Sequence, residues 1–301
     1  MTLKLQLKVY PEFKRVYGGG IIRWFDKTPP DIVCPHFWEL NWAYGCKFEC
    51  SYCYLQGTFH GNKKPWHRPL SQVYMILDEF FQDHKDKPQI LNSGELTDSL
   101  VYPEIMEKVA DKFEEQNKHK LLLLTKSSNI KLLVDRPRKQ TIFSFSMNTK
   151  EVWKRWEHKT PLPDERIKAA KVAIEAGDEV RVRIDPIFPI ENWKLDYEDL
   201  IYSILSEFTP ERITLGTPRG LAKTLMFSKD LSWTKYFNKG EITGWGKKIS
   251  DELRSEIYLF FYDKLHNLGF DKSKIATCKE TVLMWKDLGL DPTKIKCNCV
   301  L

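Results

Sequence analysis

The stretch that decides the fold reads LLLLT and covers residues 121–125. A continuous apolar run of this length is typical of a parallel strand that is buried on both faces. Outward from this run, strand-like and helix-like patterns alternate about six times over residues 37–217. This alternation predicts a parallel sheet with helices outside it, either open or rolled into a barrel.

The predicted elements follow from apolar spacing and from the glycine and proline residues that bound each segment. The predicted strands cover residues 37–44, 88–93, 121–125, 141–148, 179–189 and 211–217. The predicted helices cover residues 70–84, 103–117, 129–134, 164–177, 197–208 and 250–269. Polar motifs stand where strands end: SGE at 93–95, TKS at 125–127, SMN at 146–148 and DP at 185–186. Active sites of parallel barrels gather at these strand ends, so we expect the site there.

The sequence divides into three segments. Residues 1–33 read as an N-terminal arm, and residues 34–217 as the alternating barrel domain. Residues 218–301 are basic, aromatic and cysteine-containing, and we expect a C-terminal extension packed against the barrel.

Composition and charge narrow the functional classes. The 301 residues are 42% hydrophobic and 29% charged, which is typical of a globular protein. The net charge of +6 permits a nucleic-acid partner without requiring one. No apolar run is long enough to span a membrane, and the N-terminus MTLKLQLKVYPEFKR lacks the features of a secretory signal. We therefore expect a cytoplasmic protein with no membrane partner and, in that reducing compartment, no disulfides.

Three of the seven cysteines lie within eight residues of each other. The stretch GCKFECSYCYLQG (45–57) places Cys46, Cys50 and Cys53 in the spacing C-x3-C-x2-C. Thiolates bind zinc and iron–sulfur clusters, and a structural zinc site needs four protein ligands. Three cysteines leave one position open, which either His60 or Cys34 could fill. The loop is too polar for three merely structural, buried cysteines.

This motif, with an aromatic residue before its last cysteine, resembles the signature of the radical S-adenosylmethionine (radical SAM) enzymes. The resemblance implies a [4Fe–4S] cluster on Cys46, Cys50 and Cys53, whose open iron chelates S-adenosylmethionine. It implies reductive cleavage of the sulfonium to a 5′-deoxyadenosyl radical, with a reductase, flavodoxin or ferredoxin as electron donor. It also implies a partial (β/α)6 TIM-type barrel, which agrees with the six units counted above.

Further segments resemble the spore photoproduct lyase group within that superfamily, over roughly residues 37–200. They are CSYCYLQGTF (50–59), KKPWHRP (63–69), GELTDSL (94–100), LLLLTKSSNIKLL (121–133), FSFSMNTKEVWKRWEHKTP (143–161), ERIKAAKVAIEAG (165–177) and RIDPIFPIENW (183–193). The resemblance implies a lyase-like DNA-repair activity or modification of a DNA or RNA base, with DNA the more expected partner.

The resemblance assigns cofactor-binding roles to five residues. Gly94 and Glu95 lie where the superfamily contacts the methionine amino group, which suits a carboxylate. Lys126 matches the lysine that meets the methionine carboxylate. Ser146 and Asn148 match a polar pair that contacts the ribose or the carboxylate. The alternatives are a helix-capping lysine and a polar pair that faces only polar neighbours.

Two tyrosines and one strand carry further candidates. Tyr52 and Tyr54 flank the last cysteine of the motif, and the resemblance implies catalytic roles for them in cofactor positioning and hydrogen-atom relay. For Tyr54 the alternative is core packing. Arg181 and Arg183 share one face of a strand, so they are candidates to bind phosphate or carboxylate if that face is the interior. Asp185 is the inward candidate if they point outward.

The chain departs from the lyase pattern in three places. The lyase uses a further cysteine past its second strand to return a hydrogen atom, and LNSGELTDSLVY (91–102) has none. No segment aligns with the lesion-binding hairpin of the lyase, although residues 217–248 are basic and aromatic. The C-terminal residues Cys278, Cys297 and Cys299 resemble an auxiliary cluster site. Cys34 is a candidate fourth ligand, and zinc or a metal-free thiol pair is the alternative.

Three functional hypotheses follow. The leading one is a radical SAM enzyme that acts on a nucleic-acid base. The second keeps the radical chemistry but directs it to a peptide, protein or small molecule, with help from an auxiliary cluster. The third is a non-enzymatic, zinc-stabilised nucleic-acid-binding module.

Overall fold

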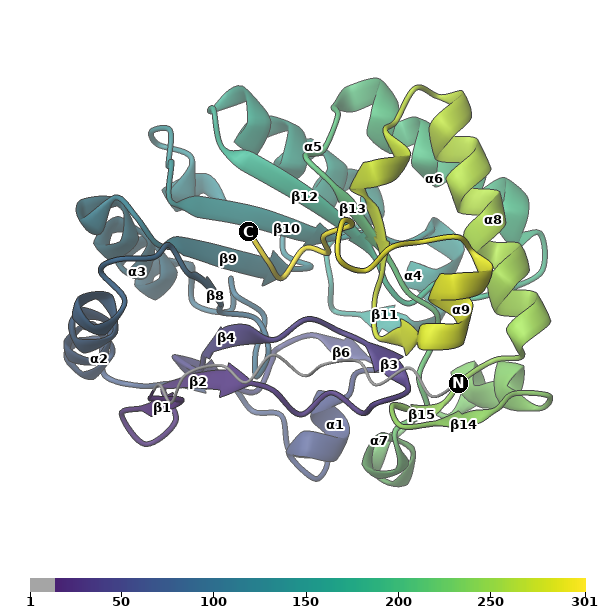
Figure 1. The fold of residues 1–301 in the computed structure, drawn as a ribbon, viewed down its shortest axis with the longest axis horizontal. Helices are drawn as coiled ribbons and strands as arrows, with labels where there is room; N and C mark the ends of the chain where they lie inside the picture. Colours follow the sequence, from purple (N-terminus) through teal and green to yellow (C-terminus); the bar gives the residue numbers. More distant parts are fainter. Residues whose placement is uncertain (1–13) are drawn as a thin grey trace.

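A nine-stranded sheet forms the centre of the protein, with the strand order β1-β2-β4-β8-β9-β10-β12-β13-β16 (Figure 1). The computed structural model describes residues 14–301, so the start of the predicted arm and most of the segment examined for a secretory signal lie outside it. The strands of this sheet are β1 (Val16–Tyr17), β2 (Ile22–Phe25), β4 (Phe37–Leu40), β8 (Ile90–Asn92), β9 (Lys120–Thr125), β10 (Thr141–Ser146), β12 (Glu179–Ile184), β13 (Ile213–Leu215) and β16 (Ile275–Thr277).

Seven neighbouring strands, from β4 to β16, run parallel, and β2 and β1 continue the sheet antiparallel at one edge. The six strands predicted from the sequence are all present, in chain order and side by side. The predicted α/β class with a parallel sheet is therefore confirmed. The seventh parallel strand, β16, was not predicted.

Helices cover the outer face of the curved sheet (Figure 1). The longer ones are α2 (Leu70–Asp83), α3 (Pro103–Gln116), α4 (Lys150–Trp156), α5 (Pro163–Glu175), α6 (Trp193–Glu207) and α8 (Asp251–Asn267), and the short ones are α1 (Leu55–Thr58), α7 (Ala222–Phe227) and α9 (Val282–Asp287). Proline opens α3 and α5, where its missing amide costs nothing. The helix predicted at 129–134 is only a 3-10 turn, Lys131–Leu133. Within residues 14–301, no helix combines the length and the apolar character needed to cross a bilayer.

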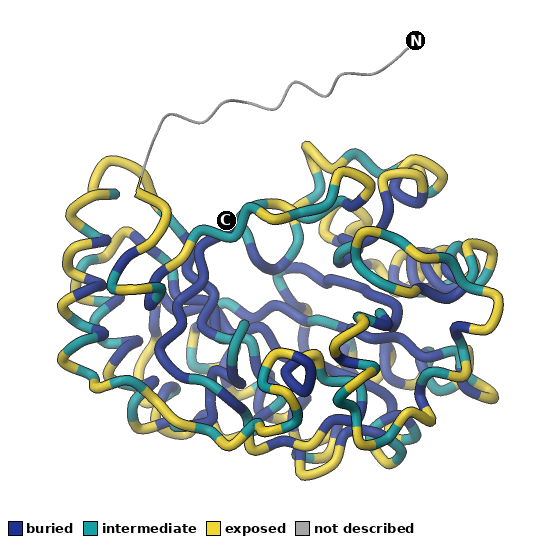
Figure 2. Tube along the Cα trace, turned by 90° about the horizontal axis from the view of Figure 1, so that it is seen from below, coloured by how far each residue is buried: buried dark blue, intermediate teal, exposed yellow. Residues whose placement is uncertain are grey.

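The apolar run that opened the sequence argument lies in β9, in the middle of the sheet. Leu121 and Leu123 pack into the main core, whereas Leu122 faces the opposite side, with Phe37 and Ile142. All three leucines are fully buried, so the strand is covered on both faces as its composition predicted. Figure 2 shows the strands as a buried centre with exposed chain outside.

Four pairs of short strands fix the loops around the sheet. They are β3 (Ile32–Val33) with β17 (Glu280–Thr281), β5 (Ala43–Tyr44) with β7 (Trp66–His67), β6 (Glu49–Cys50) with β11 (Glu157–His158), and β14 (Ile242–Thr243) with β15 (Gly246–Lys247). The first pair joins the segment before residue 34 to the segment after residue 217. Strands β2 and β16 also belong to the central sheet. The predicted segment boundaries after residues 33 and 217 therefore fall within one continuous structure.

His119, just before β9, makes folding stability dependent on pH. Its ring stacks on Phe81 and is 1% exposed, and its Nδ1 accepts a hydrogen bond of 3.1 Å from the Gln89 amide. Burial lowers the pKa of His119 to about 4, so the folded state binds fewer protons than the unfolded state between pH 6.5 and 4.

We expect the free energy of unfolding to fall as the pH drops through this window, by up to about 3 kcal/mol. Urea titrations at several pH values should show this loss in the wild type and a flatter profile in His119→Gln. His266, which is exposed, supplies the matched control His266→Gln. An unchanged pH profile in His119→Gln would contradict the assignment.

Candidate functional site

A cavity of about 570 Å³ opens at the carboxyl ends of the parallel strands. Residues from many separated parts of the chain line it, as expected for a parallel α/β site. The lining includes Cys46, Cys50, Cys53, Tyr52, Tyr54, Gly94, Glu95, Lys126, Ser146, Arg183, Asp185, Arg219 and Lys279. The structure thus brings together most of the site residues that the sequence singled out.

The cysteine loop is held at both ends. The Cys46 amide donates a 2.9 Å hydrogen bond to the Lys63 carbonyl, and β6 pairs with β11 so that Cys50 faces Glu157. Gly45, with φ +75°, lies so close to the Lys64 carbonyl that a Cβ atom would approach its oxygen to 2.5 Å. Only glycine satisfies both conditions, and the first cysteine follows directly from that turn.

The three thiols suit a metal centre chemically. Burial raises the pKa of Cys46 to about 12 and raises that of Cys50, while the nearby charge of Lys126 opposes the rise at Cys50. Such thiols stay protonated until a metal displaces the protons. In residues 14–301, no three His, Cys, Asp or Glu side chains are already gathered as a metal site. The loop nevertheless fits a metal centre in its chemistry, because three soft sulfur donors lie on one short segment and line the same cavity.

A buried ion pair lies directly behind the loop. Arg166 Nη2 is 2.6 Å from Glu157 Oε2, and both side chains are at most 1% exposed. The Tyr52 hydroxyl donates to the other oxygen of Glu157. Burial would raise the pKa of Glu157, but Arg166 and Lys126 outweigh it, so the pKa lies below its usual range. Tyr52 therefore anchors the cysteine loop to this charged pair.

The loop after β8 closes another side of the cavity. A Cβ atom on Gly94 would lie 2.6 Å from Leu124 Cβ and 2.8 Å from the Leu124 carbonyl oxygen, so only glycine permits this approach. Glu95 accepts a 2.8 Å hydrogen bond from the Asn92 side chain, and its carbonyl accepts one from the Tyr54 hydroxyl. The second tyrosine is thus held at the cavity, with 38% of its surface exposed.

Lys126 and Ser146 lie at the ends of neighbouring strands β9 and β10. The Lys126 amide donates a 2.7 Å hydrogen bond to the buried Asp98 carboxylate, which fixes the turn after the strand. Its ammonium lies 5.7 Å from the centre of the Tyr52 ring and is not held by any ion pair described for residues 14–301. Lys126 is therefore a cation available to an anionic ligand.

Asn148 does not reach this cavity. Its Nδ2 donates to the Pro186 carbonyl at 2.9 Å, and its Oδ1 accepts from the Tyr197 hydroxyl and the Thr149 amide at 2.9 and 3.0 Å. The side chain is fully buried, so the structure gives it a role in holding the loop after β10. Asn148 therefore does not line the cavity where we expect the cofactor to bind.

The two arginines of β12 both point inward, but they serve different partners. Arg181 donates to the carbonyls of Asn298 and Val300 at 2.7 and 2.8 Å, so it holds the chain's own C-terminal tail. Arg183 lines the cavity together with Asp185. The inward orientation was one of the two alternatives that the sequence left open.

Several lining residues were missed by sequence reasoning. Glu39 is the one charged residue in the otherwise apolar strand β4, and this could have identified it from the sequence. Its carboxylate accepts two hydrogen bonds from Arg23, at 2.6 and 2.9 Å. Arg219 contacts both Asp185 oxygens at 2.8 Å. Burial would raise the pKa of Asp185, but the arginines outweigh it and lower the pKa.

Two aromatic rings and a cation stand together in the lining. Trp245 lies at the tip of the β14–β15 hairpin, and its ring centre is 5.9 Å from that of Phe25. Lys279 Nζ lies 4.6 Å from the centre of the Trp245 ring. The hairpin tip is held by a 2.8 Å hydrogen bond from the Gly244 amide to Asp31. The sequence alone did not predict this hairpin.

The remaining predicted ligands lie outside this cavity. Cys278, Cys297 and Cys299 are not among the residues that line it, although Lys279, next to Cys278, is. The cavity therefore contains one set of thiols, and the C-terminal cysteines form a separate group.

A parallel α/β sheet with a C-x3-C-x2-C loop over a cavity at the strand ends defines a radical SAM enzyme. The family model of spore photoproduct lyase matches residues 35–216, more than half of the chain, and the chain belongs to the spore photoproduct lyase family.

Comparison with individual proteins agrees. The chain is 27% identical over 258 residues to the spore photoproduct lyase of Clostridium acetobutylicum, a match covering 79% of this chain and 75% of that one. It is 29% identical over 183 residues to that of Bacillus subtilis, covering 58% of this chain and about half, 52%, of the relative.

Solved structures show the same fold. A spore photoproduct lyase complexed with dinucleoside spore photoproduct has a TM-score of 0.68 at 19% identity, covering 84% of this chain and 78% of that one. SuiB of Streptococcus suis bound to S-adenosylmethionine has a TM-score of 0.52 at 15% identity, covering 81% and 50%. The predicted resemblance, fold class and enzyme class are confirmed, and the two alternative functions are not favoured.

Proposed function

We propose that the protein cleaves S-adenosylmethionine at a [4Fe–4S] cluster on Cys46, Cys50 and Cys53 and repairs a thymine photoproduct in DNA. The observation that carries the proposal is the convergence of these three thiols with Glu95 and Lys126 on one cavity. When bound, the cluster would supply the electron that cleaves the sulfonium and yields a 5′-deoxyadenosyl radical. The family membership of the chain supports the same reading.

The chain's own residues provide binding and orientation. Glu95 offers a carboxylate to the methionine ammonium, and Lys126 offers a cation to the methionine carboxylate. Ser146 adds a hydroxyl at the end of the next strand. Tyr52 and Tyr54 flank the last cysteine of the loop. Each hydroxyl donates a hydrogen bond within the protein, to the Glu157 carboxylate and to the Glu95 carbonyl respectively. These contacts place a zwitterionic ligand next to the thiols.

Another part of the cavity lining suits a lesion in DNA. Trp245 and Phe25 contribute aromatic rings against which bases can pack. Arg183 and Lys279 line the same cavity and provide positive charge for phosphate. A spore photoproduct lyase of similar fold is complexed with dinucleoside spore photoproduct, which supports the proposal.

The test is a product assay on the anaerobically reconstituted protein. Dinucleoside spore photoproduct, S-adenosylmethionine and dithionite are supplied, and thymidine products and 5′-deoxyadenosine are quantified by mass spectrometry. We expect the repaired dinucleoside only in the complete mixture. Formation of 5′-deoxyadenosine with an untouched lesion would overturn the substrate assignment while leaving the radical chemistry in place.

One observation favours a second candidate, radical modification of an undamaged base. The lining between residues 94 and 98 contains no cysteine, so the hydrogen donor expected there from the family resemblance is missing. Incubation with undamaged DNA and RNA, followed by nucleoside analysis, separates the two candidates. A modified nucleoside without photoproduct repair would select the second.

A further inference from the structure

The four cysteines outside the catalytic cavity come together from three distant parts of the chain. Cys34 and Cys297 pack against the buried cluster that contains Cys299, and Cys278 is itself buried. We define the four-thiol cluster by these residues: Cys34, Cys278, Cys297 and Cys299. The sequence left open whether the first of them joins the other three.

Strand pairing explains the contribution of Cys34. Val33 of β3 pairs with Glu280 of β17, so Cys34 directly follows one strand and Cys278 lies two residues before the other. Cys34 also packs against the buried cluster that contains Cys299. Two segments that are more than 240 residues apart in the chain thus bring Cys34 and Cys278 to the same end of this strand pair.

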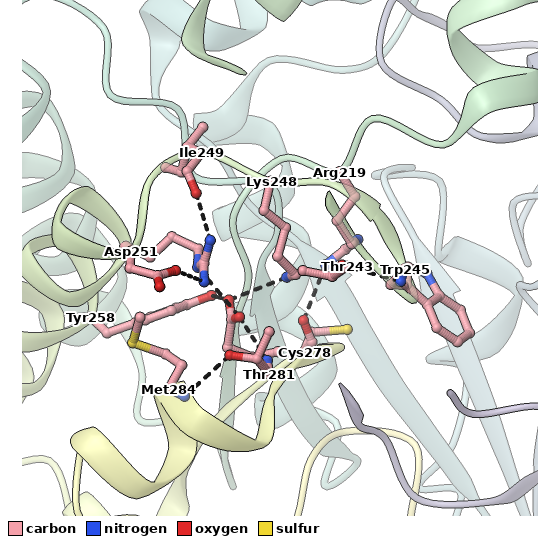
Figure 3. Close-up of polar contacts among 12 residues, drawn as sticks. Arg219, Thr243, Trp245, Lys248, Ile249, Asp251, Tyr258, Cys278, Thr281 and Met284 are labelled. Atoms are coloured by element: carbon pink, nitrogen blue, oxygen red, sulfur yellow. Dashed lines mark hydrogen bonds and ion pairs between the residues drawn. The ribbon is translucent and has the colours of Figure 1, made fainter. Parts of the chain in front are cut away.

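Cys278 is held firmly in place. Its amide donates to the Leu215 carbonyl at 2.7 Å, and its carbonyl accepts from Arg219 at 3.2 Å. Figure 3 shows this contact beside a group of polar contacts that includes Lys248, Tyr258 and Thr281. Glu280 Oε2 accepts from Tyr258 at 2.8 Å and from Lys248 at 3.3 Å, and all three side chains are fully buried. The network fixes β17 and therefore the residues just before it.

The last two thiols are presented by a turn of the C-terminal tail, which crosses β10 and β12 in Figure 1. The Val300 amide donates to the Cys297 carbonyl at 3.4 Å, closing the turn. Asn298, between Cys297 and Cys299, donates from its side chain to Ser144 at 2.9 Å and to the Val182 carbonyl at 3.0 Å. Its amide donates to the Thr214 hydroxyl at 3.0 Å. Contacts with β10, β12 and β13 therefore hold this turn in place.

The thiols lie beside charged groups. Arg183 Nη2 lies 3.5 Å from the Cys299 sulfur, and Arg219 donates to the Cys278 carbonyl at 3.2 Å. Both Asp185 oxygens accept from Arg219 at 2.8 Å, so Arg219 brings no net charge to the site. Four soft donors beside Arg183 and Lys279 are suited to a thiolate-bound metal, whose complex carries net negative charge.

We propose that the four-thiol cluster is a second metal site, which takes a thiophilic metal centre through four thiolates and leaves no position open for substrate. Zinc and an iron–sulfur cluster share this ligand chemistry. In residues 14–301, the sulfurs of the four-thiol cluster are not close enough together to bind a metal ion, and the same is true of Cys46, Cys50 and Cys53. Metal binding would draw the tail turn and the residue-34 loop together. The proposal does not rest on the proposed catalytic function, although Arg183 and Lys279 also line the catalytic cavity.

The test removes the first site and asks what metal remains. The full-length variant Cys46→Ala/Cys50→Ala/Cys53→Ala is isolated anaerobically, loaded with iron and sulfide or with zinc, and analysed for metal and sulfide. We expect about four irons with sulfide, or about one zinc, per chain. The sulfide content and the visible absorption distinguish the two occupants. An absence of bound metal in both loadings would overturn the proposal.

A second comparison assigns the ligands. Adding Cys34→Ser, or Cys297→Ser with Cys299→Ser, to the triple variant is expected to abolish the remaining metal. Lys296→Ala changes an exposed residue of the same tail, keeps all four thiols and should retain metal, which makes it the matched control. Metal that persists without Cys34 would contradict a four-thiolate site. Because the readout is metal content alone, failure here leaves the proposed repair activity untouched.

Discussion

Replacement of Arg166 by methionine is expected to lower the free energy of unfolding by about 3–5 kcal/mol. The guanidinium lies 2.6 Å from the Glu157 carboxylate in a region where both are almost completely buried. Without it, Glu157 remains in the interior with no cation of comparable proximity and must either stay charged or bind a proton. Arg166 also donates to the Ser146 carbonyl and the Thr160 hydroxyl, so further acceptors lose a partner.

The measurement is urea unfolding of the metal-free protein, followed by far-ultraviolet circular dichroism at pH 7. Arg155→Met is the matched control, because Arg155 forms an ion pair of the same length with Glu151 but on a half-exposed helix surface. An exposed pair contributes little, so the control should change stability by no more than about 0.5 kcal/mol. Equal effects of the two substitutions would show that burial of the Arg166 pair does not govern stability.

The second large effect is expected for Cys50→Ser. Cys50 is the buried member of the three-cysteine loop and the residue that pairs with Glu157 across β6 and β11. A hydroxyl is a poor ligand for the metals that thiolates bind, so the first site should lose its cluster. We expect iron to fall by about four atoms per chain and 5′-deoxyadenosine formation to drop below detection.

The comparison variant is Cys297→Ser, which changes a thiol on the tail and leaves the first loop intact. It should keep cleavage of S-adenosylmethionine measurable. If Cys50→Ser still cleaves S-adenosylmethionine at the wild-type rate, the cluster is held elsewhere and the proposed catalytic site is wrong. Circular dichroism of both variants shows whether the fold survives each change.

The parts of the fold that could be predicted are those with a local pattern. The buried strand at Leu121–Leu123 and the helices on either side follow from apolar spacing within a few residues, because each element buries a whole face. The three-cysteine loop is equally local. Lining positions such as Gly94 and Lys126 were predicted because polar residues at strand ends converge on one edge.

The parts that could not be predicted depend on pairing between distant segments. Nothing near Glu157 in the sequence indicates that it supports a loop 107 residues earlier, as its pairing with Cys50 shows. The same is true of Cys34, which is placed by the pairing of β3 with β17. Asn148 was interpreted as a ligand contact, whereas Tyr197 and Pro186 occupy its polar atoms. Such partners are known only once the chain is folded.

The position of Arg181 has a consequence for how the chain reaches its native state. Its guanidinium is satisfied by carbonyls that lie 117 and 119 residues further along the chain. Closing so long a loop costs chain entropy before its contacts form, which is a feature of slow-folding topologies. Until the tail docks, a charged group in the middle of the sheet must keep its water. We therefore expect the water around Arg181 to be released only when the tail docks on the sheet.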